Sequence, residues 1–163
     1  MPVEPEINLR PQSPDQADVR ELLAELDRHL MGLYEPDHNH LFDLQALLAP
    51  EVYFLVARKQ GRALGFGAVR MMPGAPDGKG CAYGEIKRMF VRPESRGQRL
   101  GERVLIALEG ELRRHGINLA KLETGDLQPE ALRLYERRGY TRCAPFGGYE
   151  DNGTSVFYAK ALP

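Results

Sequence analysis

Cysteine, tryptophan and long apolar runs are scarce or absent in this chain of 163 residues. Tryptophan is missing, and the two cysteines, Cys81 and Cys143, have neither the number nor the spacing of a disulfide framework or a metal site. No apolar run approaches the roughly 20 residues that a membrane span needs. The N-terminal residues are acidic, whereas a signal peptide begins with basic residues. We therefore expect a cytoplasmic protein that has no membrane partner.

An excess of charge of one sign is also lacking. The formal net charge is −1, which argues against nucleic acid as a partner because nucleic-acid-binding domains are usually strongly basic. The charge is unevenly placed, since residues 1–80 carry more acid than base and residues 81–163 carry more base than acid. A basic C-terminal half suits a phosphate-bearing ligand, although scattered surface charge explains the difference equally well.

The hydrophobic pattern predicts one α/β domain over residues 1–163. The hydrophobic content of 42% is typical of a globular protein, and we find no internal repeat. Apolar spacing and turn residues predict helices and strands in this order: strand 7–10, a helix capped by Ser13 or Asp15 and ending near 33, helix 43–48, strands 52–57, 63–71 and 82–91, a helix from 96 to about 115, strand 118–123, helix 129–138, strands 140–143 and 155–160. This order predicts a mixed central sheet of six to seven strands flanked by about four helices.

The first segment that suggests chemistry follows the strand that ends near Val91. A short loop rich in arginine and glycine leads there into an amphipathic helix, so backbone N–H groups and the positive end of a helix dipole meet in one place. Gly97 and Gly101 permit close approach, and Arg96 and Arg99 add positive charge. This arrangement favours a pyrophosphate, whereas an ordinary connection with surface arginines is the alternative. The motifs of P-loop and Rossmann dinucleotide sites are absent.

Two motifs make the sequence resemble the GNAT superfamily of N-acetyltransferases. The family motif Gln/Arg-x-x-Gly-x-Gly/Ala reads Arg-Gly-Gln-Arg-Leu-Gly over residues 96–101, with Arg99 in place of the usual middle glycine. The second motif, Ala-x-x-x-Tyr-Glu-Lys-x-Gly-Phe, is matched over residues 131–140, and Gln128 stands where the family often has asparagine. The stretch 85–91, taken with 122–125, looks like an uncharacterised bacterial branch of the family.

The resemblance implies a GNAT-like fold and acetyl-coenzyme A (acetyl-CoA) as co-substrate, with no metal. In the family, backbone groups of a strand align the pantetheine arm and a loop and helix N-terminus hold the pyrophosphate. On this basis we expect the cofactor to be bound by Met89, Phe90, Val91, Arg96, Gly97, Gln98, Arg99, Leu100, Gly101, Glu102, Gln128 and Arg137.

The resemblance also implies two catalytic residues. An acceptor ammonium with a pKa near 10.4 must lose a proton before it attacks a thioester, and Glu85 is the expected base, acting through water. A carboxylate that only pairs with Lys87 or Arg88 is the alternative. Tyr135 matches the tyrosine that protonates the leaving thiolate in the family; without the resemblance it reads as a half-buried helix aromatic.

The acceptor is expected to be a primary amine of a small molecule, attacked directly in a ternary complex. Its pocket is predicted between the first helices and the loop 146–149, where acids and aromatics suit a cation. The predicted acceptor-binding residues are Tyr34, Glu35, His38, His40 and Tyr149. His38 and His40 form a metal pair less readily than part of a solvated polar loop.

Two other functions remain open from the sequence. A non-catalytic acyl-CoA sensor needs the cofactor loop but neither Glu85 nor Tyr135. A protein or peptide N-acetyltransferase needs an open groove, which sequence does not reveal. A homodimer, formed through the last strands around residues 155–160, is a further expectation.

Overall fold

The computed structural model of the protein describes residues 3–36, 43–74 and 80–163. Within them the chain forms seven strands and four α-helices, in the order β1 (Ile7–Pro11), α1 (Ala17–Leu33), α2 (Leu44–Leu47), β2 (Val52–Lys59), β3 (Arg62–Met72), β4 (Tyr83–Val91), α3 (Leu100–Arg114), β5 (Leu119–Gly125), α4 (Pro129–Arg137), β6 (Thr141–Arg142) and β7 (Ser155–Ala161). The prediction of a mixed sheet with six to seven strands and about four helices is confirmed.

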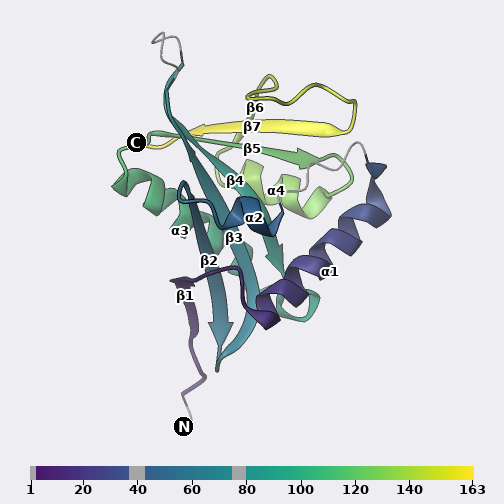
Figure 1. The fold of residues 1–163 in the computed structure, drawn as a ribbon, viewed down its shortest axis with the longest axis vertical. Helices are drawn as coiled ribbons and strands as arrows, with labels where there is room; N and C mark the ends of the chain where they lie inside the picture. The colour runs from purple at the N-terminus through teal and green to yellow at the C-terminus, as the bar shows by residue number, and fades with distance from the viewer. Residues whose placement is uncertain (1–2, 37–42, 75–79) are drawn as a thin grey trace.

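The seven strands form one sheet in the order β1-β2-β3-β4-β5-β7-β6. Neighbouring strands are antiparallel except β4 and β5, which are parallel. A parallel pair needs a crossover, and α3 supplies it. Figure 1 shows β5 and β7 running across the steep direction of β2 and β3, so the two halves of the sheet fan apart.

Two hydrophobic clusters cover the opposite faces of the sheet. On one face, α1 packs through its buried residues Val19, Leu22, Leu23 and Leu26, and the cluster includes Phe54 and Val56 of β2. The other face carries α3 and α4, whose cluster includes Leu55 and Ala57. Alternate β2 residues thus serve different clusters, as the two-residue period of a strand requires.

A β-bulge interrupts β4 beside Gly67. Phe66 pairs with Phe90 and Ala68 pairs with Lys87, so one residue of β3 faces two residues of β4. Arg88, one of these two, has a φ of 56°. The extra residue reverses the alternation of faces, because Ile86 belongs to the α3 cluster and Phe90, four residues later, to the α1 cluster. The bulge therefore re-aims the second half of β4.

The parallel pairing of β4 with β5 is short. It joins Gly84, Glu85 and Ile86 to Ala120, Lys121 and Leu122. Beyond these residues, β4 continues to pair with β3 as far as Val91, and β5 continues to pair with β7 as far as Gly125. The facing edges of β4 and β5 separate there, which opens the sheet in its middle.

Most element boundaries agree with the sequence prediction to within a few residues, with two differences at helix starts. Gln16 precedes α1 and makes no side-chain cap, so neither Ser13 nor Asp15 caps this helix; Asp15 pairs with Arg20 instead. α3 begins at Leu100 and not at residue 96, because a 3₁₀ turn over Pro93–Ser95 and the glycine-containing loop come first.

The last strand is internal to the sheet. β7 pairs with β5 along Ser155–Ala161 and with β6 at Tyr158 and Ala159, so both of its sides have partners within the chain. The homodimer expected through this strand stays a prediction. In the part of the chain that the structure describes, no helix combines the length and apolarity of a membrane span.

Candidate active site

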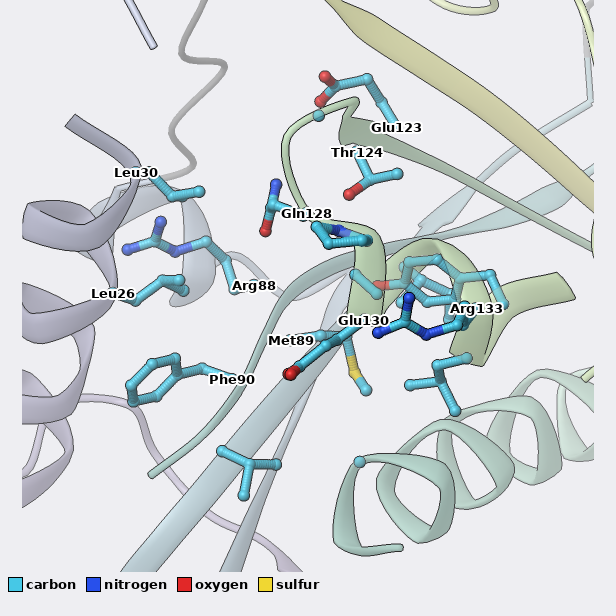
Figure 2. A pocket seen from close by; sticks show the side chains of 18 of the residues that line it. Leu26, Leu30, Arg88, Met89, Phe90, Glu123, Thr124, Gln128, Glu130 and Arg133 are labelled. Carbon is cyan, nitrogen blue, oxygen red and sulfur yellow. The ribbon is translucent and has the colours of Figure 1, made fainter. Parts of the chain in front are cut away.

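A cavity of about 800 Å³ lies where β4 and β5 separate. Its lining includes Leu26 and Leu30 from α1 on one face of the sheet, and Leu134 and Tyr135 from α4 on the other. The cavity therefore reaches both faces through the opening between the strands. Figure 2 shows Phe90 directed toward α1 and Met89 directed to the opposite side of β4.

The lining of the cavity includes a stretch of β4 that has no strand partner on the side of β5 among the described residues. Residues 89–91 of β4 line the cavity, and the strand with which this stretch pairs is β3. An extended ligand with amide groups can pair with such an edge as an added strand does. This edge is the region that we expected, from the sequence, to align the pantetheine arm.

The loop before α3 keeps a glycine-like shape although it contains Arg99. Arg99 has a φ of 57° and a ψ of 27° and precedes the first helical residue, and Gly97 has a φ of 86°. Gly101 differs, because it is helical and a Cβ there would meet Leu134 Cδ2 at an ordinary 3.5 Å. Gly101 is thus required neither by backbone conformation nor by packing, and its lack of a side chain leaves space beside the start of α3.

Positive charge is concentrated around the start of α3. The buried carboxylate of Glu102 lies 3.7 Å from Arg99, 3.9 Å from Arg137 and 3.6 Å from Arg138. One carboxylate thus faces three guanidinium groups, of which Arg99 is largely exposed. Arg96 donates from Nε to the Val91 carbonyl and lies over the Phe90 ring. The surplus of positive charge suits an anion at this helix N-terminus.

Glu85 lies in the cavity lining within a buried polar cluster. Its Oε2 accepts hydrogen bonds from Tyr149 Oη at 2.6 Å and from Lys87 Nζ at 3.1 Å. Lys87 also donates to Tyr149 Oη at 2.6 Å. The pairing with Lys87 is the alternative that the sequence left open, and the structure shows it. The other oxygen, Oε1, has no hydrogen-bond partner among the described residues, so it remains available to a ligand or water.

Tyr149 keeps its proton in this cluster. Burial, followed by the charge of Glu85 and the hydrogen bond to it, raises the pKa of the Tyr149 hydroxyl above its usual range. The ring is held by edge and tilted contacts to Phe146 and Phe157. Tyr149 therefore acts as a fixed donor to Glu85 at neutral pH.

Tyr135 lies on the opposite side of the opening, on α4. The residue is 6% exposed, and its ring packs at 5.8 Å from Tyr140 and 6.2 Å from Tyr158, measured between ring centroids. Burial, assisted by the charge of Glu123, raises the pKa of the Tyr135 hydroxyl above its usual range. The hydroxyl is therefore protonated at neutral pH, and Tyr135 is one of the residues that line the cavity.

Tyr34 joins the end of α1 to the cavity lining. Its hydroxyl accepts a hydrogen bond from the Leu127 N–H at 2.8 Å and interacts with Gln128. A Cβ on Gly125 would come within 1.9 Å of the same oxygen. The end of α1 is thereby joined to the turn between β5 and α4, and this close approach requires glycine at position 125.

The structure brings most of the predicted site residues to this cavity. The lining includes the predicted catalytic residues Glu85 and Tyr135. It also includes Tyr34 and Tyr149, which were predicted to bind the acceptor, and all the predicted cofactor-binding residues except Gln98. Gln98 instead donates to the Ser95 carbonyl, and Glu35 is exposed and is not part of the lining. His38 and His40 lie outside the described residues. Among the residues that are described, no group of three or more metal-ligating side chains gathers.

The sequence predicted the first helices at the acceptor pocket but did not single out the α1 side chains that line it. Leu26, His29 and Leu30 contribute to the cavity, but their helical spacing is also that of ordinary core residues. Arg88 was considered only as a partner for Glu85, whereas it pairs with Asp27 of α1 at 2.6 Å. The Glu85–Lys87 pair could be predicted from the sequence, because residues two apart on a strand project from the same face of the sheet.

Replacing Arg99 with glycine should stabilise the protein. A left-handed conformation costs an L-residue about 1–2 kcal/mol, and glycine removes this cost while losing about 0.4–1 kcal/mol through the unfolded chain. We expect Arg99→Gly to raise the free energy of unfolding by about 0.5 kcal/mol in urea denaturation. Arg133→Gly, in the regular helix α4, is the matched control and should lower it by about 1 kcal/mol. Equal destabilisation by both changes would contradict the assigned conformation.

Curated relatives match nearly the whole chain. An IAA acetyltransferase of Azospirillum brasilense is 42% identical over 158 residues, which cover 97% of this chain and 99% of the relative. An uncharacterised N-acetyltransferase, YsnE, of Bacillus subtilis (strain 168) is 29% identical over 153 residues, covering 91% of this chain and 97% of the relative. These similarities therefore concern the complete domain and not one motif.

Solved structures share the fold. A Klebsiella pneumoniae protein proposed to be an acyl-CoA N-acyltransferase has a TM-score of 0.79 and 34% identity, covering 96% of this chain and 97% of its own. The PaiA N-acetyltransferase of Thermoplasma acidophilum, solved with coenzyme A, has a TM-score of 0.74 and 17% identity, covering 96% and 99%. The model of the acetyltransferase (GNAT) family matches residues 17–140. The chain therefore belongs to the GNAT family of acetyltransferases.

Proposed function

We propose that the protein is an acetyl-CoA-dependent N-acetyltransferase that acetylates a primary amine of a small molecule. The observation that carries the proposal is the cavity between β4 and β5, which has Glu85 on β4 and Tyr135 on α4 in one lining. A donor entering from the α3 side and an acceptor entering from the α1 side can meet in such an opening. This supports direct attack in a ternary complex.

The residues around the opening fit acetyl-CoA, which supplies the acetyl group as a thioester. The unpaired edge of β4 at residues 89–91 offers backbone groups to the pantetheine amides. The N-terminus of α3 offers N–H groups to the pyrophosphate, with space at Gly101 and charge at Arg99 and Arg137.

The resemblance places the donor to the thioester carbonyl oxygen at the Phe90 N–H. Phe90 pairs with Phe66, however, and the next-but-one N–H, that of Arg92, donates to the Leu64 carbonyl, so the Phe90 N–H belongs to the ladder with β3. The N–H groups of Met89 and Val91 face away from β3, and we propose that one of these donates to the thioester carbonyl oxygen.

Glu85 is the proposed base. Its Oε2 is held by Lys87 and Tyr149, and Oε1 is left to receive a proton from the acceptor ammonium through water. Tyr149 fixes the orientation of the carboxylate, while Lys87 balances its charge. A positioned carboxylate of this kind serves proton transfer better than a freely rotating surface glutamate.

Tyr135 is the proposed donor to the departing sulfur. A coenzyme A thiol has a pKa near 8.5 and an ordinary tyrosine has one near 10, and burial raises the pKa of Tyr135 further. Complete proton transfer to the thiolate is then unfavourable by more than about 2 kcal/mol, at 1.36 kcal/mol per pKa unit. The hydroxyl therefore acts by donating a hydrogen bond as negative charge develops on sulfur.

Relatives support a small acceptor over a peptide. The name of the Azospirillum relative, IAA acetyltransferase, indicates a small-molecule acceptor for that protein, and this chain matches it over nearly its full length. A non-catalytic sensor would need no buried Glu85 cluster. Both cysteines are free, which agrees with the cytoplasmic location that we propose.

An aspartate at position 101 should disable cofactor binding. The Gly101→Asp carboxylate would occupy the space beside the α3 N-terminus and repel the pyrophosphate, so we expect acetyl-CoA affinity to fall at least tenfold in calorimetric titration. Gly110→Asp is the control on the same helix, because a Cβ at Gly110 meets nothing within 4 Å; its affinity should stay within twofold of the parent. If both variants keep the affinity of the parent, acetyl-CoA does not bind at this site.

Removing the Tyr135 hydroxyl should slow the reaction without weakening binding. We expect Tyr135→Phe to reduce turnover at least tenfold, measured as coenzyme A release with a panel of primary amines, and to leave acetyl-CoA affinity unchanged. Tyr53 lies outside the cavity lining, so Tyr53→Phe serves as the control and should keep the turnover of the parent. Parent-like turnover of Tyr135→Phe, with the chemical step rate-limiting, is the result that would exclude Tyr135 as the donor.

A further inference from the structure

Arg88 is the least satisfied charged group of the cavity lining. Its side chain is 6% exposed and its Nη2 pairs with Asp27 Oδ1 at 2.6 Å. The buried Nε and Nη1 atoms have no hydrogen-bond acceptor among the described residues. An arginine carries one N–H on Nε and two on Nη1, so three buried donors are left without a partner.

A guanidinium in this state favours an anionic ligand. Arginine stays charged when buried, and buried donors without acceptors are unfavourable in a folded protein. A carboxylate is the group whose geometry matches a guanidinium. The β-bulge places Arg88 with a φ of 56°, outside the regular strand conformation, so the chain maintains a strained backbone that turns this side chain toward α1.

The surroundings of Arg88 indicate what else such a ligand carries. Leu26 and Leu30 of α1 and Phe90 of β4 line the same cavity, and Figure 2 shows the Arg88 side chain running from β4 toward the two leucines. These apolar side chains suit an apolar body. The pair Glu85 and Lys87 lies earlier on the same strand, where the acceptor amine is proposed to lose its proton.

We infer that the acceptor carries a carboxylate on an apolar body and that Arg88 selects it. The inference rests on the proposed function, since it assigns the acceptor class to the same cavity. The amine end lies toward Glu85, the apolar body lies along α1, and the carboxylate accepts hydrogen bonds from Arg88. Asp27 pairs with the guanidinium from α1 and is a positioning residue.

Carboxylate binding can be tested without turnover. Calorimetric titrations of the acetyl-CoA-loaded protein should compare phenylacetate, 3-phenylpropanoate and 4-phenylbutanoate, each with its amide. We expect at least one acid to bind ten times more tightly than its amide. Arg88→Met should abolish this preference, and Arg88→Gln provides a second variant if the first does not fold; acetyl-CoA affinity should be unchanged in the folded variants.

Asp27→Asn separates selection from structural support. It removes the charge that pairs with Arg88 but keeps the guanidinium, so the preference for the acid should persist. The inference would be overturned if the parent protein prefers no acid over its amide, or if the preference survives in both Arg88 variants. It would also be overturned if Asp27→Asn loses the preference for the acid while the Arg88 variants keep it.

The proposed function itself is tested separately with 4-(aminomethyl)phenylacetate and its amide as acceptors. Faster acetylation of the acid, by at least tenfold in kcat/KM, supports both proposals. Intact carboxylate binding without acetylation of either compound would contradict amine acetylation and leave Arg88 as a carboxylate site. Equal acetylation of both compounds would support the function and contradict the role of Arg88.

Discussion

The separation of β4 from β5 is the structural constraint on which the site depends. Three residue pairs hold the strands together, at Gly84–Ile86 and Ala120–Leu122, and each strand then follows its antiparallel neighbour on the outer side. If β4 and β5 stayed paired along their whole length, their backbone groups would be hydrogen-bonded to each other and the sheet would separate the two helical layers. The opening instead exposes a strand edge and joins the α1 face to the α3 face, so two ligands can approach from different sides.

The bulge at Arg88 and the left-handed Arg99 adapt the two sides of this opening. The bulge directs Met89 toward α3 and Phe90 toward α1, and it gives Arg88 access to α1. Arg99 stands at the position of the middle glycine of the GNAT motif and has a left-handed backbone conformation, which glycine adopts most readily, so this position carries a charge in a glycine-like conformation. Both positions tolerate strain at the candidate site, where strained backbone often occurs. The arginines near Glu102 give one end of the cavity a positive charge, and this is the end that we propose for the cofactor; Glu85 lies at the end that we propose for proton transfer.

Local sequence patterns were sufficient to predict the helices and strands but not the contacts between residues far apart in the sequence. Apolar periodicity located the helices and strands, and two motifs located the α3 loop and Tyr135. Nothing in Lys87-Arg88-Met89 indicates a bulge, because the extra residue shows only in the register against Gly67. Tyr149 reaches Glu85 across 64 positions, and Tyr34 reaches Leu127 across 93; such pairs depend on tertiary packing. The helix start at Leu100 was missed because charged loop residues before it continued the helical pattern.

Amide hydrogen exchange along β4 tests the central claim most directly. Saturating coenzyme A should slow exchange at N–H groups within residues 89–91 and at the first turn of α3, since the ligand is proposed to pair with the open strand edge and the helix N-terminus. Exchange in β1, which lies at the far edge of the sheet, should not change. Binding that leaves β4 exchange unaltered, while the affinity measured by calorimetry is intact, would show that the cofactor does not enter the opening between β4 and β5.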